Sequence, residues 1–559
     1  MAKNSRRLLV PFVAGLAAGA VAVAVAIILK ETSGGLFLPE ITSQTLFSVT
    51  PGEFESQAVE NFGPLAKYSA FIGSIIANIV VFGIIAIFLD KIFARIKRRG
   101  NLQEALLSSA LSYIIFIIIA ILMVTLIQSR SGIQVVPLSL VVVSLIPSQL
   151  AFGFVLSSFF HGRANANGKS FDVPETVIEP MTEPSPVKSI DTMGIKYSRR
   201  AFLGLLASGA IALPIIFLGV DRLLSRQNEE QEQESTTPLL PQGGPRPKGF
   251  EDPNLVPLLA SEVTPTYLFY RIDINPIVPQ VDSKSWNLTI KGLVEKPLTI
   301  NYDQIKAMPS IEEYVTLECV SNKVGGELIS TALWKGVRLS YLLGKAAIKP
   351  NVKYVVFRCA DGYDVGIPIE RSQMEGTILA YDMNYSPLTS KHGFPVRAIV
   401  PGLYGMMNPK WITEIELVDM VYEGYWQRLG WANNAEDKTG SSILIPGQAP
   451  ARQRFRKLDE TAISPNEGKV PIAGIAFAGD RGIAKIEVST DGGTTWKTAK
   501  VKDPLSQYTW VLWTAGYVPP NNENYAIVVR ATDKTGKIQT TEMSPPFPSG
   551  ATGYHTITV

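Results

Sequence analysis

Cysteine and histidine are both rare in this chain. Its 559 residues include two cysteines, Cys319 and Cys359, and three histidines, His161, His392 and His555. There is no Cys-x-x-Cys-His segment, which excludes the usual covalent attachment of haem. No two of the histidines are placed to face each other across a helix bundle, so we expect no haem in this chain. The sequence has no iron–sulfur motif either.

A large excess of charge of either sign is also missing. Lys and Arg number 52 against 49 Asp and Glu, for a formal net charge of +3. The flanks of apolar runs account for this small excess. The sequence therefore gives no reason to expect a nucleic acid partner.

Long apolar runs dominate the N-terminal part of the chain. Each is close to 20 residues long with almost no charge inside it, which suits a hydrocarbon core of about 30 Å and argues against buried helices of a soluble protein. We predict a four-helix membrane region over residues 1–161 and a fifth transmembrane helix over residues 201–221. The runs themselves cover residues 8–29, 68–89, 105–127, 135–160 and 201–220.

The charges beside these runs predict their orientation. Basic clusters precede the first run, follow the second and lie between the fourth and the fifth, whereas the connection over residues 30–67 is rich in glutamate. Basic flanks stay preferentially in the cytoplasm. We therefore expect a multi-pass protein of the cell membrane, in contact with membrane lipid, with a cytoplasmic N-terminus and everything after residue 220 outside the cytoplasm.

Two polar stretches with several prolines are typical of linkers. Residues 162–200 form the predicted cytoplasmic linker and residues 222–254 the extracytoplasmic one. The first ends in Ser198-Arg199-Arg200-Ala201-Phe202-Leu203-Gly204, which resembles a twin-arginine export signal; the alternative is that the paired arginines mark the cytoplasmic end of a helix. No convincing Ala-x-Ala cleavage site follows, so we expect the fifth helix to remain as an anchor.

The C-terminal half alternates between short strands and short helices. Alternation of polar and apolar residues predicts a strand over 286–290, and residues 303–308 and 339–347 are typical of helices, which indicates a mixed α+β domain over 255–425. A connecting segment over 426–464 leads to a predicted β-sandwich over 465–559. Its expected strands cover residues 470–478, 483–490, 494–501, 509–514 and 525–532.

Cys319 lies in informative surroundings, the segment Cys-Val-Ser-Asn-x-Val-Gly-Gly. The stretch over residues 267–419 resembles the cofactor domain of the sulfite oxidase family of molybdopterin enzymes, in its membrane-anchored bacterial branch. The resemblance implies a Mo-molybdopterin cofactor with the Cys319 thiolate as metal ligand, a role that suits a soft anionic sulfur. A small buried hydrophobe is the alternative for a lone cysteine. A disulfide would remove the thiolate, so we expect both cysteines to be unpaired.

The resemblance assigns further residues to the cofactor. The segments over 392–397 and 405–411 match the family's cofactor-binding segments, with the charged side chains near the phosphate. The implied cofactor-binding residues are Tyr270, Arg271, Asn322, Cys359, Asp361, His392, Arg397, Asn408, Pro409 and Lys410. Tyr381 aligns with a tyrosine that lies beside the metal in sulfite-oxidising relatives and is the implied catalytic partner of Cys319; plain packing of its ring is the alternative.

The chain departs from the family at the substrate pocket. Sulfite oxidases typically place Arg and then Asn-His after the Phe-Tyr element, and Arg-Arg after the Cys-x-x-Asn element. Here Ile272, Asp273 and Ile274 occupy the first place, and Lys323 and Val324 the second. Most of the cationic pocket for a small dianion is absent, and one lysine alone compensates poorly for the cost of desolvating such an ion. Sulfite is therefore a doubtful substrate, although fold and cofactor can persist when the substrate changes.

These observations favour a membrane-anchored molybdopterin oxidoreductase that performs two-electron, oxygen-atom-transfer chemistry on a small molecule. The direction stays open, because a related branch reduces sulfoxides. A separate redox partner is needed: a cytochrome, a membrane haem protein or a quinone. The last hundred residues resemble the immunoglobulin-like domain of the same family, which implies a homodimer. The alternatives are an inert receptor or scaffold, and a transporter, which the lack of charge inside the apolar runs argues against.

Overall fold

The computed structural model describes residues 2–33, 35, 37–62, 65–93, 101–131, 138–167, 199–235, 262–445, 470–517 and 526–559. Most of the expected linkers lie outside these residues, namely 168–198, which includes the first residue of the twin-arginine-like segment, 236–254 and 446–464. The chain divides into two compact units. The first comprises residues 1–45, 69–126 and 136–225, and the second comprises residues 46–68, 127–135 and 226–559.

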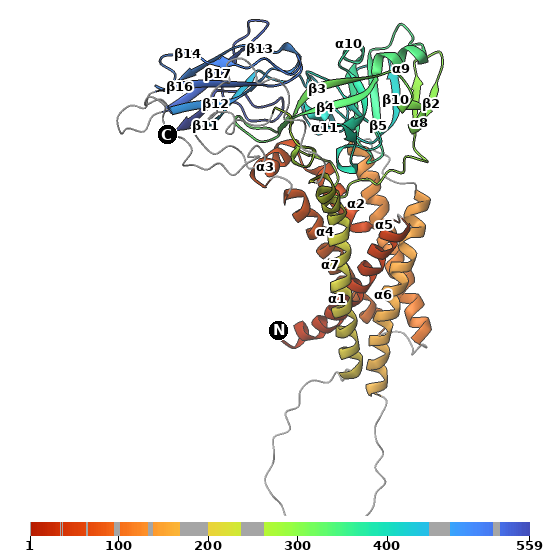
Figure 1. Ribbon diagram of the computed structural model, residues 1–559. Helices are drawn as coiled ribbons and strands as arrows, with labels where there is room; N and C mark the ends of the chain where they lie inside the picture. Colours follow the sequence, from red (N-terminus) through yellow and green to blue (C-terminus); the bar gives the residue numbers. More distant parts are fainter. Residues whose placement is uncertain are drawn as a thin grey trace, which may run out of the picture. The chain divides into compact units, whose positions relative to one another are not determined.

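The first unit is built from long apolar helices (Figure 1). They are α1 (Ala2–Ser33), α4 (Leu65–Phe93), α5 (Asn101–Ser131), α6 (Leu138–Asn167) and α7 (Arg199–Ser235). Each contains a stretch that is long and apolar enough to cross a membrane. The five predicted apolar helices are thus confirmed as helices.

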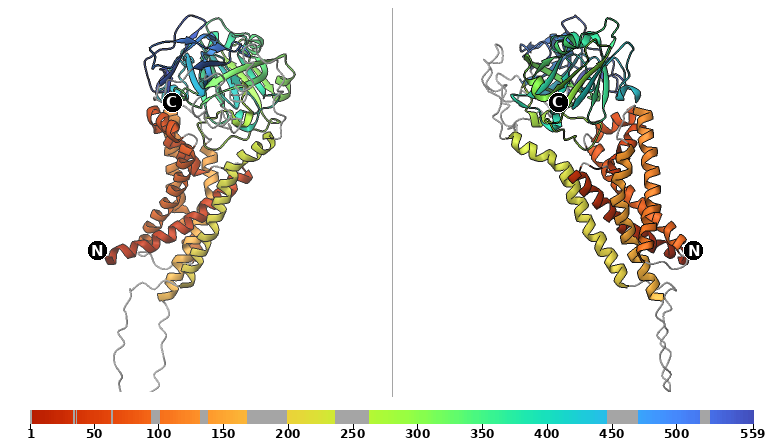
Figure 2. Two further views of the ribbon diagram at one scale, coloured as in Figure 1. Left: turned by 60° about the vertical axis from the view of Figure 1, so that its left-hand side comes forward. Right: turned by 90° about the vertical axis from the view of Figure 1, so that its right-hand side faces the viewer.

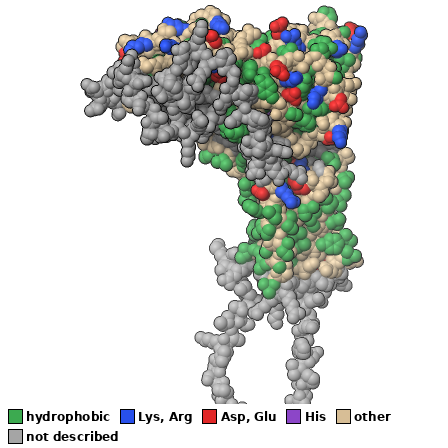
Figure 3. All heavy atoms as spheres, in the orientation of Figure 1, with side chains coloured by type: hydrophobic (Ala, Val, Ile, Leu, Met, Phe, Trp, Pro, Cys, Tyr) green, Lys and Arg blue, Asp and Glu red, His purple; other side chains and the backbone are tan. Residues whose placement is uncertain are grey.

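Small residues allow these helices to approach closely. A Cβ atom added at Gly83 of α4 would lie 2.7 Å from the ring of Phe12 of α1, and one at Gly209 of α7 would lie 3.2 Å from the Cβ atom of Ala17 of α1. Figure 2 shows α1 and α7 passing each other. Large apolar side chains such as Ile76 lie exposed on the same unit, where Figure 3 shows a hydrophobic surface. Small residues between helices and large apolar ones facing outward are typical of membrane bundles.

Two further helices interrupt the connection between the first two apolar runs. Helix α2 covers Leu38–Val49 and helix α3 covers Gly52–Phe62. The sequence indicated a glutamate-rich connection over residues 30–67 and no helix. Two of those glutamates, Glu53 and Glu55, lie in the first turn of α3, where a negative charge stabilises the helix dipole. Residues 46–68 belong to the second unit, and we call them the α3 segment.

The part of the second unit that follows residue 262 begins with one mixed sheet, one antiparallel sheet and short helices. The first sheet has the order β2-β1-β10-β5-β6, in which β1 runs parallel to β10 and the other pairs are antiparallel. The second has the order β3-β4-β7-β8, and β9 also pairs with β7. The strands are β1 (Asn287–Gly292), β2 (Leu298–Asn301), β3 (Ser310–Glu318), β4 (Ile329–Arg338), β5 (Tyr354–Cys359), β6 (Asp364–Pro368), β7 (Ile378–Met383), β8 (Ser386–Pro387), β9 (Arg397–Ile399) and β10 (Ile412–Val418).

Short helices connect these strands, and this arrangement confirms the predicted mixed α+β class. Helices α8 and α9 correspond to the two predicted helical stretches, and β1 corresponds to the predicted strand. The helices are η1 (Thr266–Leu268), α8 (Tyr302–Lys306), α9 (Leu339–Ala346), α10 (Ile369–Gln373), η2 (Ser390–His392), η3 (Gly405–Met407) and α11 (Tyr425–Arg428). A buried cluster that includes Trp334, Ile378 and Cys319 forms the core around the second sheet.

The C-terminal part consists of two four-stranded sheets, with orders β11-β12-β16-β15 and β14-β13-β17-β18. Ile443 and Trp513 from the first sheet share one buried core with Ile486 and Val529 from the second, so this part is a β-sandwich, as predicted. Strand β11 lies inside the stretch that was expected to be a connection. It is a strand because it pairs with β12. The strands are β11 (Gly440–Ile445), β12 (Val470–Phe477), β13 (Ile483–Ser489), β14 (Lys497–Thr498), β15 (Lys500–Val501), β16 (Val511–Tyr517), β17 (Ala526–Asp533) and β18 (His555–Thr558).

Candidate active site

Cys319 is the first residue after β3, in a loop that its own backbone and Asn322 hold in place. The Cys319 N–H donates to the Leu328 carbonyl at 2.8 Å, and the Cys319 carbonyl accepts from the Asn322 N–H at 2.9 Å. The Asn322 side chain donates to a Glu318 carboxylate oxygen at 2.8 Å and accepts from the Leu328 N–H at 3.0 Å. Asn322 therefore fixes the position of the thiol by organising its loop.

The thiol is buried and free. Cys319 is 6% exposed, and both it and Cys359 are unpaired. Burial raises the pKa of the Cys319 thiol to about 11, against the lowering effect of hydrogen bonds from Ser321 and of the positive charge of Lys67. A bound metal cation takes the place of the thiol proton and removes this cost of burying an anion. The surroundings of Cys319 therefore suit a metal-bound thiolate better than a free one.

Arg397 brings a buried positive charge to the site from β9. Its guanidinium lies 4.8 Å from the centre of the Trp334 ring. It donates to the carbonyls of His392 and Asn408 at 3.2 Å each, and its buried Nε has no hydrogen-bond partner among the described residues. Burial lowers the pKa of Arg397 to about 10. A buried guanidinium held by carbonyls, with one donor unused, fits an anionic group such as a phosphate.

Lys410 and Arg271 meet at Asp273. Lys410 pairs with one carboxylate oxygen of Asp273, and the Arg271 Nε lies 3.1 Å from the other. Burial lowers the pKa of Lys410 to about 8. Nearby, burial raises the pKa of Asp361 to about 7, and the charge of Asp273 adds to this effect. With Arg397, the site gathers three cations around one paired carboxylate, a donor set that fits the phosphate and polar rings of molybdopterin.

His392, Asn408 and Pro409 surround these cations. The His392 Nε2 donates to the Thr266 carbonyl at 2.9 Å. Burial, with the charges of Arg397 and Lys410, holds the pKa of His392 well below its usual range, so the ring is neutral. The Asn408 side chain accepts from the Val400 N–H at 2.6 Å and donates to two backbone carbonyls, and the Pro409 carbonyl accepts from Ala398 at 2.9 Å. Asn408 and Pro409 shape the loop that carries Lys410.

Of the two tyrosines named from the sequence, the structure brings Tyr270 to Cys319. Burial and then the charge of Cys319 raise the pKa of Tyr270 well above its usual value, so the phenol keeps its proton. Tyr381 lies on β7 where the register with β4 shifts, and its charge, after burial and Asp382, raises the pKa of Tyr302 to about 12. The role of Tyr381 beside the metal therefore stays a prediction, and Tyr270, which shares one buried cluster with Cys319, is a second candidate for a phenol at the site.

The sequence did not identify Lys67 as a site residue. Its ammonium donates to the Asp273 carbonyl and lies 3.7 Å from a carboxylate oxygen of Glu55. One signal was present: Lys67 lies at the glutamate-rich end of an apolar run, where the orientation rule predicts few basic residues.

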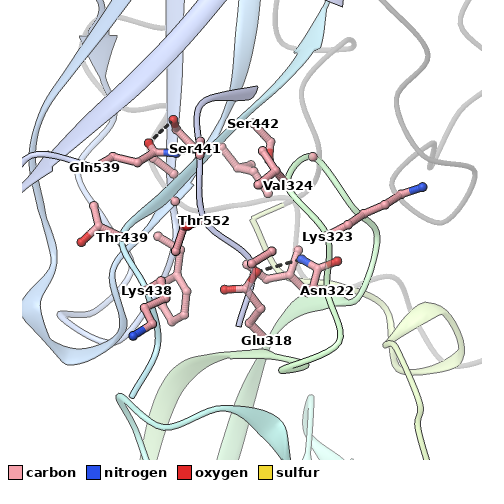
Figure 4. A pocket seen from close by; sticks show the side chains of 18 of the residues that line it. Glu318, Asn322, Lys323, Val324, Lys438, Thr439, Ser441, Ser442, Gln539 and Thr552 are labelled. Carbon is pink, nitrogen blue, oxygen red and sulfur yellow. Dashed lines mark hydrogen bonds between the residues drawn. The ribbon is translucent and has the colours of Figure 1, made fainter. Parts of the chain in front are cut away.

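A pocket adjoins the Cys319 loop on the side of the β-sandwich (Figure 4). Glu318 and Asn322 line it from the loop, and Lys438 and Thr552 line it from the C-terminal part. Burial raises the pKa of Glu318 to about 7. Lys323 also lines the pocket; its side chain is exposed and extends outward from the loop in Figure 4.

Comparison with known proteins identifies both parts of the second unit that follow residue 262. Residues 275–426 match the family described as "Oxidoreductase molybdopterin binding domain", and residues 453–547 match "Mo-co oxidoreductase dimerisation domain". The chain is 31% identical over 350 residues to mitochondrial sulfite oxidase of Macaca fascicularis, covering 55% of this chain and 63% of that protein. It is 33% identical over 150 residues to the uncharacterized oxidoreductase YuiH of Bacillus subtilis (strain 168), covering 27% of this chain and 74% of that protein.

Among solved structures, the chain is similar to the sulfane dehydrogenase SoxCD from Paracoccus pantotrophus. The identity is 24% and the TM-score 0.46, over 54% of this chain and 83% of that one. The chain spans a little under two thirds of the length of the sulfite oxidase from Macaca, 63%. The matched domains and the buried Cys319 site confirm the family predicted from the sequence: the chain belongs to the sulfite oxidase family of molybdopterin oxidoreductases.

Proposed function

We propose that the protein is a molybdenum-dependent oxidoreductase that performs two-electron, oxygen-atom-transfer chemistry on a small molecule. The observation that carries this proposal is the buried Cys319 thiol beside the cations Arg397, Lys410 and Arg271, inside the matched molybdopterin-binding domain. Molybdopterin supplies the two-electron redox chemistry when it is bound. The protein supplies the ligand, the charges and the exclusion of water.

The side chains divide these tasks among them. Cys319 holds the metal, and Arg397 and Lys410 hold the phosphate end of the cofactor. Tyr270, whose raised pKa keeps the phenol protonated at neutral pH, would serve as a hydrogen-bond donor at the site, and Tyr381 would be the catalytic partner of Cys319 that the sequence predicts. The neutral His392 donates to the Thr266 carbonyl and so anchors the edge of the site without adding a charge. Asn322, Cys359, Asp361, Asn408 and Pro409 shape the surrounding loops.

The location of the reaction is part of the proposal. The five apolar helices support anchoring in a membrane, and the distribution of basic residues beside them supports a cytoplasmic N-terminus and an extracytoplasmic catalytic domain. Export of the folded, cofactor-loaded domain through the twin-arginine-like segment suits a cofactor that is inserted in the cytoplasm. Electrons then pass to or from a separate cytochrome, membrane haem protein or quinone. The C-terminal sandwich, which we take to be immunoglobulin-like, forms a homodimer.

A specific observation supports a second direction for the reaction. Asp273 stands at a position where relatives carry part of their anion pocket, and its carboxylate forms ion pairs with Lys410 and Arg271. These cations are therefore already paired with a carboxylate. A neutral sulfur–oxygen group needs no such pocket, so reduction of a sulfoxide is the alternative to oxidation of an anionic substrate.

Metal analysis tests the proposal. Full-length protein purified in detergent is assayed for molybdenum by plasma mass spectrometry, together with the variants Cys319→Ser and Ser372→Ala. We expect about one molybdenum per chain in the wild type, loss of nearly all of it in Cys319→Ser, and retention in Ser372→Ala, which changes another buried small side chain. A wild type without molybdenum, or a Cys319→Ser variant that keeps it, would contradict the proposal.

A further inference from the structure

The α3 segment packs directly on the cofactor domain. The N–H of Gly52, at the start of α3, donates to the Leu429 carbonyl at 3.3 Å. A Cβ atom at Gly52 would lie 2.9 Å from that carbonyl oxygen and 3.0 Å from the Trp431 Nε1, so a larger residue does not fit without movement. The start of α3 is therefore held against the domain by close backbone contact.

The other end of the segment reaches the candidate site. Lys67 is 8% exposed, and its ammonium donates to the carbonyl of Asp273. The next residue, Tyr68, accepts a hydrogen bond from the Arg271 guanidinium at 3.2 Å. Two consecutive residues of the segment thus contact Asp273 and Arg271, and Asp273 is one of the residues that stand in place of the family's Arg-Asn-His element.

Aromatic rings fix the Lys67 side chain. Its ammonium lies 5.8 Å from the ring centre of Phe47 and 5.8 Å from that of Trp426. Phe47 belongs to the α3 segment, and Trp426 lies in helix α11 at the end of the matched molybdopterin-binding domain. Contact with two ring faces favours a cation at this point and restricts its movement.

The charge of Lys67 is only partly balanced. Its carboxylate partner Glu55 lies at 3.7 Å, and the second carboxylate oxygen of Glu55 is buried with no hydrogen-bond partner among the described residues. Burial raises the pKa of Glu55, which weakens its negative charge as a partner. Burial raises the pKa of the Cys319 thiol, and the positive charge of Lys67 acts in the opposite direction and lowers it.

We propose that Lys67 is a specificity-determining residue that supplies, from outside the cofactor domain, a cation for an oxyanion at the Cys319 site. This inference rests on the proposed function. It gives the chain a replacement for the cations that its own cofactor domain lacks at Ile272 and Val324. The oxyanion is either the phosphate of the cofactor or an anionic substrate, and the same ammonium suits both.

The test compares four variants of the full-length protein in detergent. Lys67→Met removes the charge and keeps much of the side-chain length, and Lys67→Arg keeps the charge. Lys502→Met is the matched control, because Lys502 is another buried lysine, 11% exposed at its side chain, that pairs with a glutamate. Glu55→Gln removes the partial counter-charge. Molybdenum content is measured for each variant, and sulfate, an oxyanion that does not react, is titrated by calorimetry.

The expected results differ for the two sources of oxyanion. If the substrate is the oxyanion, Lys67→Met keeps its molybdenum and binds sulfate about tenfold more weakly, Lys67→Arg restores binding, and Glu55→Gln binds sulfate several-fold more tightly. If the cofactor phosphate is the oxyanion, Lys67→Met loses most of its molybdenum, Lys67→Arg regains it, and the control Lys502→Met does not lose it. The opposite sign expected for Glu55→Gln separates an electrostatic role from simple damage to the fold.

The inference is overturned when Lys67→Met matches the wild type in both molybdenum content and sulfate affinity. It is also overturned when the molybdenum-loaded wild type binds no sulfate and Lys67→Met keeps its molybdenum. It is overturned equally when Lys502→Met loses as much as Lys67→Met. A wild type that contains no molybdenum defeats the proposed function itself, so the two failures are distinguishable. Should Lys67→Met not fold, Lys67→Gln replaces it in the same measurements, and a Lys67→Gln variant with the molybdenum content and sulfate affinity of the wild type rejects the role of Lys67.

Discussion

Arg397 is a buried charge that an anionic ligand would compensate. Its guanidinium is 5% exposed, it binds carbonyls and not a carboxylate, and its Nε has no partner among the described residues. Burying a charge under these conditions costs free energy that an anionic ligand returns.

We predict that Arg397→Met has opposite effects on the two forms. In protein produced without molybdate, the free energy of unfolding should stay the same or rise by about 1 kcal/mol, because a buried charge is replaced by an apolar chain of similar length. In protein produced with molybdate, the molybdenum content should fall by about tenfold or more. Thermal unfolding and metal analysis check the two arms. A large loss of stability in the molybdenum-free form would show that Arg397 is mainly structural.

At the scale of single residues, the sequence identified the chemical groups better than their neighbours. Cys319, Arg397 and Lys410 were named from their flanking residues, and the structure gathers them with Tyr270 around one site. Lys67 was missed because it lies about 200 residues before Asp273 in the sequence, and no local pattern joins the two. Tyr381 lies at a shift of register between β7 and β4, which the sequence did not show, and its catalytic role stays a prediction.

The loop after β3 is the element that positions the metal ligand, and a glycine limits its shape. Gly325 has a φ of +73°, and a Cβ atom there would lie 2.4 Å from the His555 Nε2 of β18. The His555 Nδ1 accepts from the Ile443 N–H at 2.9 Å, which holds the ring in place. The last strand of the sandwich thus presses against the loop that carries Cys319.

We predict that Gly325→Ala lowers the free energy of unfolding by about 2 to 3 kcal/mol, from left-handed backbone strain and from contact with His555. The double variant Gly325→Ala with His555→Ala should recover the contact part and keep about 1 kcal/mol of strain. Gly344→Ala is the control, because it lies within helix α9 and has open space around it. Denaturant unfolding checks the values. An equal loss with and without His555 would rule out contact with the histidine as a cause.

Elements with a clear periodicity of apolar residues were predictable from the sequence. Elements that depend on tertiary contacts were not. The strands of the sandwich and helices α8 and α9 follow from local alternation and end at turn residues. Helices α2 and α3 did not, because both are short, and α3 is also polar, rich in glutamate and held by contacts such as the one between Gly52 and Leu429. Strand β11 was taken for a connection because its partner β12 begins 25 residues after β11 ends.

At the scale of the whole molecule, the match to a dimerisation domain predicts the oligomeric state. We expect detergent-solubilised protein to have a mass of twice the 60.9 kDa of one chain. Multi-angle light scattering, corrected for bound detergent, measures it. A species of one chain mass at micromolar concentration would contradict the prediction.

The broad organisation was accessible from the sequence because hydropathy is a property of composition. All five long helices appear where apolar runs of about 20 residues predicted them. The grouping of residues 46–68 with the cofactor domain was not accessible, because it depends on the tertiary contacts of Gly52, Lys67 and Tyr68.

The position of the α3 segment has a consequence for how the protein is built. The ribosome makes residues 46–68 before it makes any part of the cofactor domain, yet this segment covers part of that domain, including Trp426 and Trp431. Completion of the site is therefore a docking step between a segment made early and a domain that folds later. A shortened protein that starts after α7 would leave these tryptophans uncovered and Asp273 without its contact to Lys67. Residues 46–68, although they lie between two of the long apolar helices in the sequence, are thus part of the unit that holds the candidate site.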